Sequence, residues 1–204
     1  MPLPATIPVI VLADCNVFPH ALLPLNIFEP RYCAMLRESL RNERFMAVAM
    51  LRDAEEEWGW DESDDNIHEF SCAGLLRACV GQGDGTSRLI MQGVRRIRFA
   101  RWEQREPFRV ARIEPVGSVV RDEKKARALA QQTLRHAQAF LPSEPCFARQ
   151  FEKQFGELED PEIIADVIGY NFLPCATLRQ PLLGMECVED RLKYILDYFG
   201  ASAG

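Results

Sequence analysis

The chain has 204 residues, of which 48% are apolar and 26% are charged, and these proportions are ordinary for a soluble globular protein. Its net charge of −6 argues against a general nucleic-acid binder, because such proteins carry a basic surface. No apolar run approaches the roughly 20 residues of a membrane helix, and no basic leader precedes the first charge, Asp14. The seven cysteines are scattered and odd in number, so we expect thiols in a reducing cytoplasm.

The first 120 residues predict a β-rich domain. Apolar runs at 7–12 and 45–51 are typical of strands that are covered on both faces. Two longer alternating runs flank the turn 81–86, where Asp-Gly between apolar segments indicates a hairpin. Gly93 interrupts the second of these runs and indicates a bulge or a sharp bend. A last strand is expected within 107–116.

A proline-rich crossover, 16–36, lies between the first two buried strands and contains no obvious catalytic group. Leu25 and Ile27 alternate with a polar residue, as a short strand would. A proline cannot donate to a sheet and suits the first helical turn, so we expect a helix from Pro30 to about residue 42. The spacing of its apolar residues predicts one buried face with Cys33, Leu36 and Leu40.

Residues 53–69 interrupt this pattern with nine acidic side chains and no lysine or arginine. Such a run is typical of a solvated, mobile loop. Trp58 and Trp60 are unusual there, and we expect them either to dock the loop on the body of the protein or to form part of a contact surface.

The last third of the chain, 121–204, predicts a helical bundle. Apolar residues recur at helical spacing through five segments: 122–141, 146–155, 162–172, 178–183 and 188–199. Asp160 followed by Pro161 is a good start signal for the third of them. The predicted fold class is therefore α+β, with a β-rich unit at 1–120 followed by a helical unit at 121–204.

Several motifs in order along the chain resemble the substrate-binding N-terminal domain of Lon proteases. They are VFP and PLNIFEPRY (17–19 and 24–32), the DG…GVRRIRF pattern (84–99), PFRVARIEPV (107–116) and RQPLLGMECVEDRLKYI (179–195). The resemblance implies a PUA-like β pseudo-barrel with one helix, followed by a helical bundle. Its signature residues, which we expect to be structural, are Pro19, Pro24, Leu25, Glu29, Pro30, Arg31 and Tyr32. His20 stands where the family commonly has glycine, so the turn there must accept a side chain.

The resemblance further implies a small stand-alone bacterial member, because no GxxxxGK[ST] phosphate loop of an ATPase occurs in the sequence. We expect no enzyme activity, no cofactor, no metal site and no catalytic residue. The sequence contains no GxSxG elbow, no CxxC pair and no HExxH motif. A cysteine and a histidine could still meet in space, so a Cys–His hydrolase stays open as an alternative.

The main hypothesis is a non-catalytic protein-binding module, with unfolded or extended protein segments, a protease or its clients as partners. Apolar side chains of the crossover are candidates for the contact surface: Phe18, Leu22, Leu23 and Phe28. The alternative is RNA binding through an arginine-rich strand face that includes Arg96 and Arg98. These arginines could instead pair with the acidic segment, and an acidic protein favours that interpretation.

Overall fold

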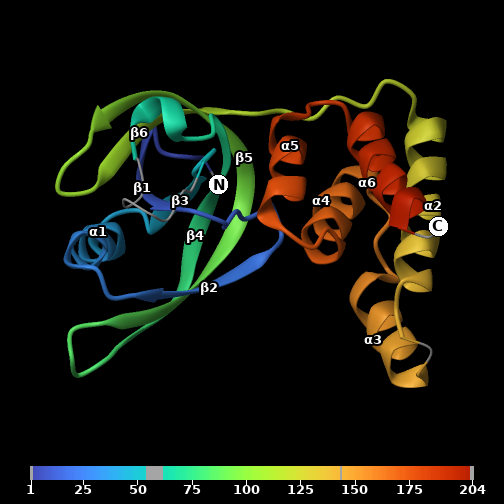
Figure 1. Ribbon diagram of the computed structural model, residues 1–204, viewed down its shortest axis with the longest axis horizontal. Helices are drawn as coiled ribbons and strands as arrows, with labels where there is room; N and C mark the ends of the chain where they lie inside the picture. Colours follow the sequence, from blue (N-terminus) through green and yellow to red (C-terminus); the bar gives the residue numbers. More distant parts are fainter. Residues whose placement is uncertain (1, 54–61, 143, 203–204) are drawn as a thin grey trace. The chain divides into compact units, whose positions relative to one another are not determined.

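The computed structural model describes residues 2–53, 62–142 and 144–202, so Trp58 and Trp60 lie outside the described residues. The chain forms two compact units, Met1–Val116 and Gly117–Gly204, which are drawn in Figure 1. The first is β-rich and the second is helical, which confirms the predicted α+β class. No helix in the described part of the chain is long and apolar enough to cross a bilayer.

The first unit is built on a six-stranded sheet in the order β2-β5-β4-β3-β1-β6. Its strands are β1 (Thr6–Leu12), β2 (Leu22–Ile27), β3 (Phe45–Met50), β4 (Phe70–Gly81), β5 (Ser87–Gln104) and β6 (Arg109–Pro115). β1 and β3 run parallel, and the other neighbours are antiparallel. An additional pairing between β5 and β6 closes five of the strands into a barrel and leaves β2 outside the ring.

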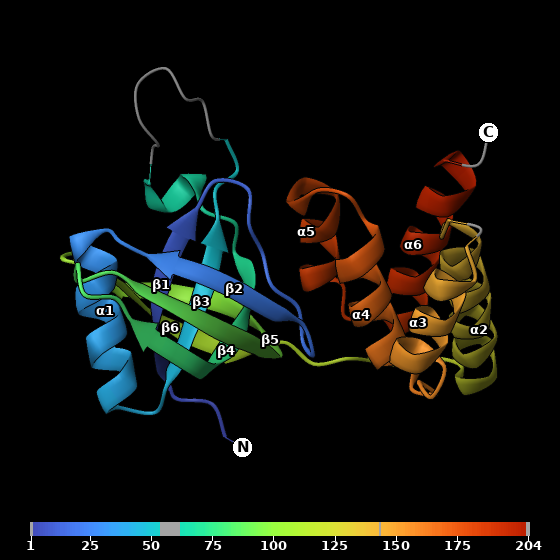
Figure 2. The ribbon, with the colours of Figure 1, turned by 90° about the horizontal axis from the view of Figure 1, so that it is seen from below.

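Strand β5 has two halves with different neighbours on the same edge (Figure 2). Ser87–Gln92, here called the β2-side half, pairs with β2, and Ile97–Gln104, the β6-side half, pairs with β6. The opposite edge pairs with β4 as far as Arg98. Between the halves the register shifts at Gly93, which confirms the predicted irregularity. The hairpin before β5 is also confirmed, since Gly85 adopts a positive φ of 88° in its turn.

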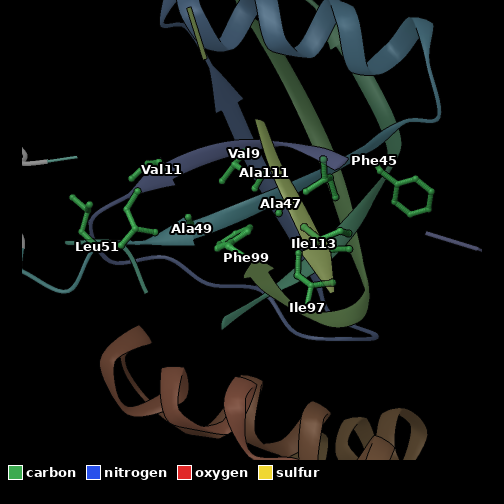
Figure 3. Packing of buried hydrophobic residues seen from close by; sticks show 13 residues of the cluster. Val9, Val11, Phe45, Ala47, Ala49, Leu51, Ile97, Phe99, Ala111 and Ile113 are labelled. Atoms are coloured by element: carbon green, nitrogen blue, oxygen red, sulfur yellow. The ribbon is translucent and has the colours of Figure 1, made fainter. Parts of the chain in front are cut away.

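The barrel interior is filled by side chains that alternate along the ring strands, as Figure 3 shows. Members of this core come from all five ring strands and include Val9, Ala47, Ala73, Ile97 and Ala111. All six residues of β3 are buried, because this strand is covered on both faces, as its unbroken apolar run predicts.

Helix α1 (Pro30–Arg41) begins at Pro30, as predicted. Its buried face is rotated from the predicted one: the buried residues are Tyr32, Met35, Leu36 and Ser39. Cys33 and Leu40 lie at the margin of that face and are partly exposed. The polar Ser39 can be buried because its hydroxyl donates to the Met35 carbonyl at 2.9 Å, a bond within the helix that composition does not reveal.

The crossover before β2 passes directly over Gly93. The amide of His20 donates to the Gly93 carbonyl, and the amide of Gly93 donates to the Ala21 carbonyl, both at 2.9 Å. A Cβ at position 93 would lie 1.9 Å from the Phe18 carbonyl oxygen, so only glycine fits. His20 adopts a φ of 68°, which is the left-handed conformation that explains glycine at this position in the resembling family.

The helical unit contains α2 (Glu123–Ala139), α3 (Pro145–Phe155), α4 (Pro161–Phe172), α5 (Ala176–Gly184) and α6 (Val188–Ser202). Asp160 caps α4 by accepting a bond from the Glu162 amide at 2.8 Å, as predicted. Arg191 on α6 is fully buried and donates to Asp166 on α4 at 2.5 Å. It also donates to Ser118 at 2.7 Å, so one side chain joins α4, α6 and the segment before α2.

Glu189, at the start of α6, holds the segment before α2 by accepting hydrogen bonds from its backbone amides. Burial by itself would raise the pKa of this carboxyl group. Hydrogen bonds from the amides of Arg121 and Asp122, at 2.9 and 2.7 Å, and from the Cys187 thiol outweigh burial. They stabilise the ionised form and lower the pKa of Glu189 to about 2.

Candidate functional site

The four crossover residues expected on a contact surface separate into two pairs. Phe18 and Leu23 are core residues, with 0% and 9% exposure, so their assignment to a contact surface is wrong. Leu22 and Phe28 are 57% and 69% exposed. Leu22 is exposed and Leu23 is buried because the pleat of β2 turns successive side chains to opposite faces of the sheet.

Leu22 belongs to a larger apolar surface on the outer face of β2, β5 and β4. The register places Pro24 opposite Ile90 and Ile90 opposite Ala78, so these three side chains form one row. In the next row Arg88 is opposite Val80. We call this surface the apolar face and define it by five exposed residues: Leu22, Pro24, Ala78, Val80 and Ile90. Val80 and Ile90 are 64% and 40% exposed.

The free edge of β2 borders the apolar face and contains a proline. The bond from the Gly93 amide to the Ala21 carbonyl fixes which residues of β2 face β5. In an antiparallel ladder the alternate residues point their backbone groups away from the partner, and here these are Leu22, Pro24 and Asn26. Pro24 has no N–H, so the open edge lacks one donor in its middle.

The remaining signature residues brace the crossover. Arg31 donates to Glu29 at 2.8 Å, and its two terminal nitrogens bind Glu62 at 2.9 and 2.7 Å. Arg31 therefore binds Glu62 of the acidic segment in a bidentate manner. Tyr32 accepts from the Val11 amide at 3.1 Å and donates to the Val11 carbonyl at 3.2 Å. Burial raises the pKa of Tyr32 to about 12.

The predicted arginine face is not an open basic surface. Arg96 is only 2% exposed, so its assignment to an outer face is wrong, although its neighbour Arg95 is exposed. Arg98 is accessible but is held by Glu114 at 2.5 Å and by Glu69 at 3.0 Å. Arg101 and Arg112 share Glu103, at 3.1 and 2.7 Å.

The described end of the acidic segment docks on the barrel through Asp64. Its carboxylate binds Arg109 at 2.7 Å and also pairs with Arg105. Arg109 lies 4.7 Å from the centre of the Trp102 ring and donates to the Glu62 carbonyl. Burial by itself would raise the pKa of Asp64, and the two arginines outweigh it and lower the pKa below the ordinary value.

Other candidate chemistry is sparse in the described residues. No group of three or more His, Cys, Asp or Glu side chains among them could hold a metal ion. All seven cysteines are described, and each is present as a thiol. Burial raises the pKa of Cys187, which is the opposite of what an activated nucleophile requires.

Sequence analysis missed three residues of the apolar face, namely Ala78, Val80 and Ile90. A signal exists for Ile90, because Leu89 and Met91 alternate with it in β5 and a β-strand turns the alternate residue outward. The alternation divides the side chains of the strand into two sets, one for each face of the sheet. Which face is covered depends on the neighbours of the strand, and the alternation does not contain that information.

Solved structures place this barrel and bundle in one structural class. The fold matches the N-terminal domain of the Lon protease of the Mycobacterium avium complex with a TM-score of 0.73 and 16% identity, over 96% of this chain and 98% of that one. It also matches a Lon N-terminal domain protein from Xanthomonas campestris with a TM-score of 0.66 and 17% identity, over 95% of this chain and 98% of that one.

The sequence then identifies the family. Residues 6–199 match the family described as the ATP-dependent protease La (LON) substrate-binding domain, and the chain belongs to this family. The Lon proteases of Dictyoglomus thermophilum and Anaeromyxobacter dehalogenans are 22% and 27% identical, each over 96% of this chain. The chain spans only 24% and 23% of those two proteins, so the match is to their substrate-binding part.

Proposed function

We propose that this chain is a non-catalytic module that binds unfolded or extended segments of other proteins through the apolar face. Membership of a substrate-binding family supports a recognition role. The proposed physiological setting is cytoplasmic proteolysis or quality control, in which the module acts as an adaptor between clients and a protease.

The observation that carries this proposal is the concentration of exposed apolar side chains on one sheet. The described residues include eight large hydrophobic side chains that are exposed. Leu22, Ile90 and Val80 lie on the apolar face, and Phe28 directly follows β2. Clustered exposed apolar residues mark interaction surfaces, because water-exposed hydrocarbon is unfavourable unless a partner covers it.

The open edge of β2 favours contact through side chains over strand addition. A peptide that extends the sheet needs a regular row of donors and acceptors. Pro24 interrupts that row, while its ring adds apolar surface next to Ile90. We therefore propose that the bound segment lies on the outer face of the sheet.

The proposal can be tested by capture of a chemically denatured model protein and of the same protein in its native state. The unaltered chain is expected to retain the denatured form selectively. The combined substitutions Leu22→Ser, Val80→Thr and Ile90→Thr should abolish this selectivity. Val120→Thr is the matched control, since Val120 is 37% exposed and lies in the helical unit. Equal capture of native and denatured protein would contradict the proposal.

A further inference from the structure

A cavity of about 330 Å³ opens beside the apolar face. Ala78 belongs to both, so the two surfaces are continuous. Leu40, at the end of α1, and Leu76 form apolar parts of its wall. Its charged residues are Arg44 and Arg77, and neither aspartate nor glutamate is among the described residues that line it.

Arg44 is held in an unusual backbone conformation at this cavity. Its φ is 61°, in the left-handed region that is unfavourable for a residue with a side chain. Its amide donates to the Ser39 carbonyl at 3.0 Å, and its carbonyl accepts from the Leu76 amide at 2.9 Å. Glycine is the usual residue where a chain leaves a helix in this conformation. An arginine in this strained conformation at the cavity wall is a candidate for a functional side chain.

The arginines around the apolar face are not neutralised by described carboxylates. The Arg77 side chain donates to the neutral amide of Gln92 at 2.6 Å. Within the described residues, no ion pair involves Arg44, Arg77 or Arg88. Arg44 also borders a second cavity that contains Glu38 and Glu43, yet neither carboxylate pairs with it there.

We propose that the cavity beside β4 binds the carboxylate of an acidic side chain within the apolar segment that the apolar face holds. This inference rests on the proposed function and specifies its substrate class: extended apolar segments that contain an aspartate or glutamate. Arginine suits this role because its planar guanidinium binds a carboxylate through paired, charge-assisted hydrogen bonds. The charge complementarity and the continuity through Ala78 both favour this occupant.

The test uses two peptides that are acetylated at the N-terminus and amidated at the C-terminus. Each is an extended sequence of leucine, valine and threonine, with a central glutamate in one and glutamine in the other. Titration calorimetry of the full chain should show binding about tenfold tighter for the glutamate peptide. Arg44→Gly and Arg77→Gln should each reduce this ratio to below about threefold.

Arg44→Gly is expected to fold, because glycine adopts a positive φ without strain, and circular dichroism checks this. Arg95→Gln, which removes an exposed charge outside the cavity lining, should preserve the ratio. Equal affinity for the two peptides would overturn the inference while leaving the proposed function intact. So would selectivity for the glutamate peptide that survives both cavity substitutions. If neither peptide binds and denatured protein is not retained, the proposed function itself fails.

Discussion

The two halves of β5 present outer surfaces of opposite character. Along the β2-side half, Arg88 and Ile90 are exposed beside apolar neighbours, and no described carboxylate pairs with the arginine. Along the β6-side half, Arg98 is held by Glu114 of β6, and Arg101 is held by Glu103 of β5 itself. The same residue type is thus available to a partner on one surface and neutralised on the other.

The difference follows from which strand lies next to each half. β6 brings Arg112 and Glu114 against β5 and completes charge pairs there. β2 carries leucines, a proline and one asparagine and offers no carboxylate. Ion pairs consume hydrogen-bonding capacity that a ligand would otherwise use, which supports the proposal that the β2-side half is the binding surface.

The largest expected effect comes from Gly93, where the two halves meet. In Gly93→Ala the new methyl group would lie 1.9 Å from the Phe18 carbonyl oxygen and 3.2 Å from the Cys72 sulfur. The crossover must then move away, and we expect a loss of at least roughly 3 kcal/mol in the free energy of unfolding. Urea unfolding measures it. Gly83→Ala is the control, since nothing lies within 4 Å of its added Cβ; equal midpoints for the two variants would refute the close approach.

Next in size is the loss of Arg109, which anchors the acidic segment beside the β6-side half. Its side chain is 9% exposed, binds Asp64 and covers Trp102. Arg109→Gln should cost about 2 kcal/mol, because a mostly buried charged hydrogen bond and a cation–π contact are lost. Arg105 is the other partner of Asp64, and its side chain is 59% exposed. Arg105→Gln should therefore lower the free energy of unfolding far less. Similar thermal midpoints for both variants would contradict the proposed anchoring role.

A smaller effect is the loss of stability at acidic pH. The pKa of Asp64 is depressed in the folded state, so its contribution to stability is fully present above the ordinary carboxyl pKa. It is lost as pH falls from there through the lower pKa of the folded state. The stability difference between the unaltered chain and Asp64→Asn should be constant above about pH 5 and shrink below about pH 4. Denaturant titrations across this range measure it, and a difference that grows on acidification would show the opposite sign.

The smallest effect should distinguish the exposed arginines of the two halves. Arg98 is 42% exposed and its ion pairs are screened by salt. Arg98→Gln should lower the thermal midpoint slightly at low ionic strength and not at about 1 M salt. Arg88→Gln has no described ion pair to lose and should leave the midpoint unchanged under both conditions. A larger loss for Arg88→Gln would mean that the β2-side half carries a structural charge contact.

Local patterns in the sequence determined the elements of this protein. The unbroken apolar run of β3, the Asp-Gly turn before β5, Pro30 at the start of α1 and the Asp160 cap all act within a few residues. The conformations they favour therefore do not depend on distant parts of the chain. The family motifs, taken in order, implied the same fold class through resemblance.

Tertiary structure alone decided which side chains are exposed and which charges are paired. Phe18 is buried because the crossover passes over Gly93, and Leu22 is exposed because β2 lies outside the barrel ring. Arg96 is buried although its neighbour Arg95 is exposed. Arg31 finds Glu62 across 31 residues of sequence. Burial and charge pairing depend on which distant element lies against a face, and alternation along a strand carries no information about that neighbour.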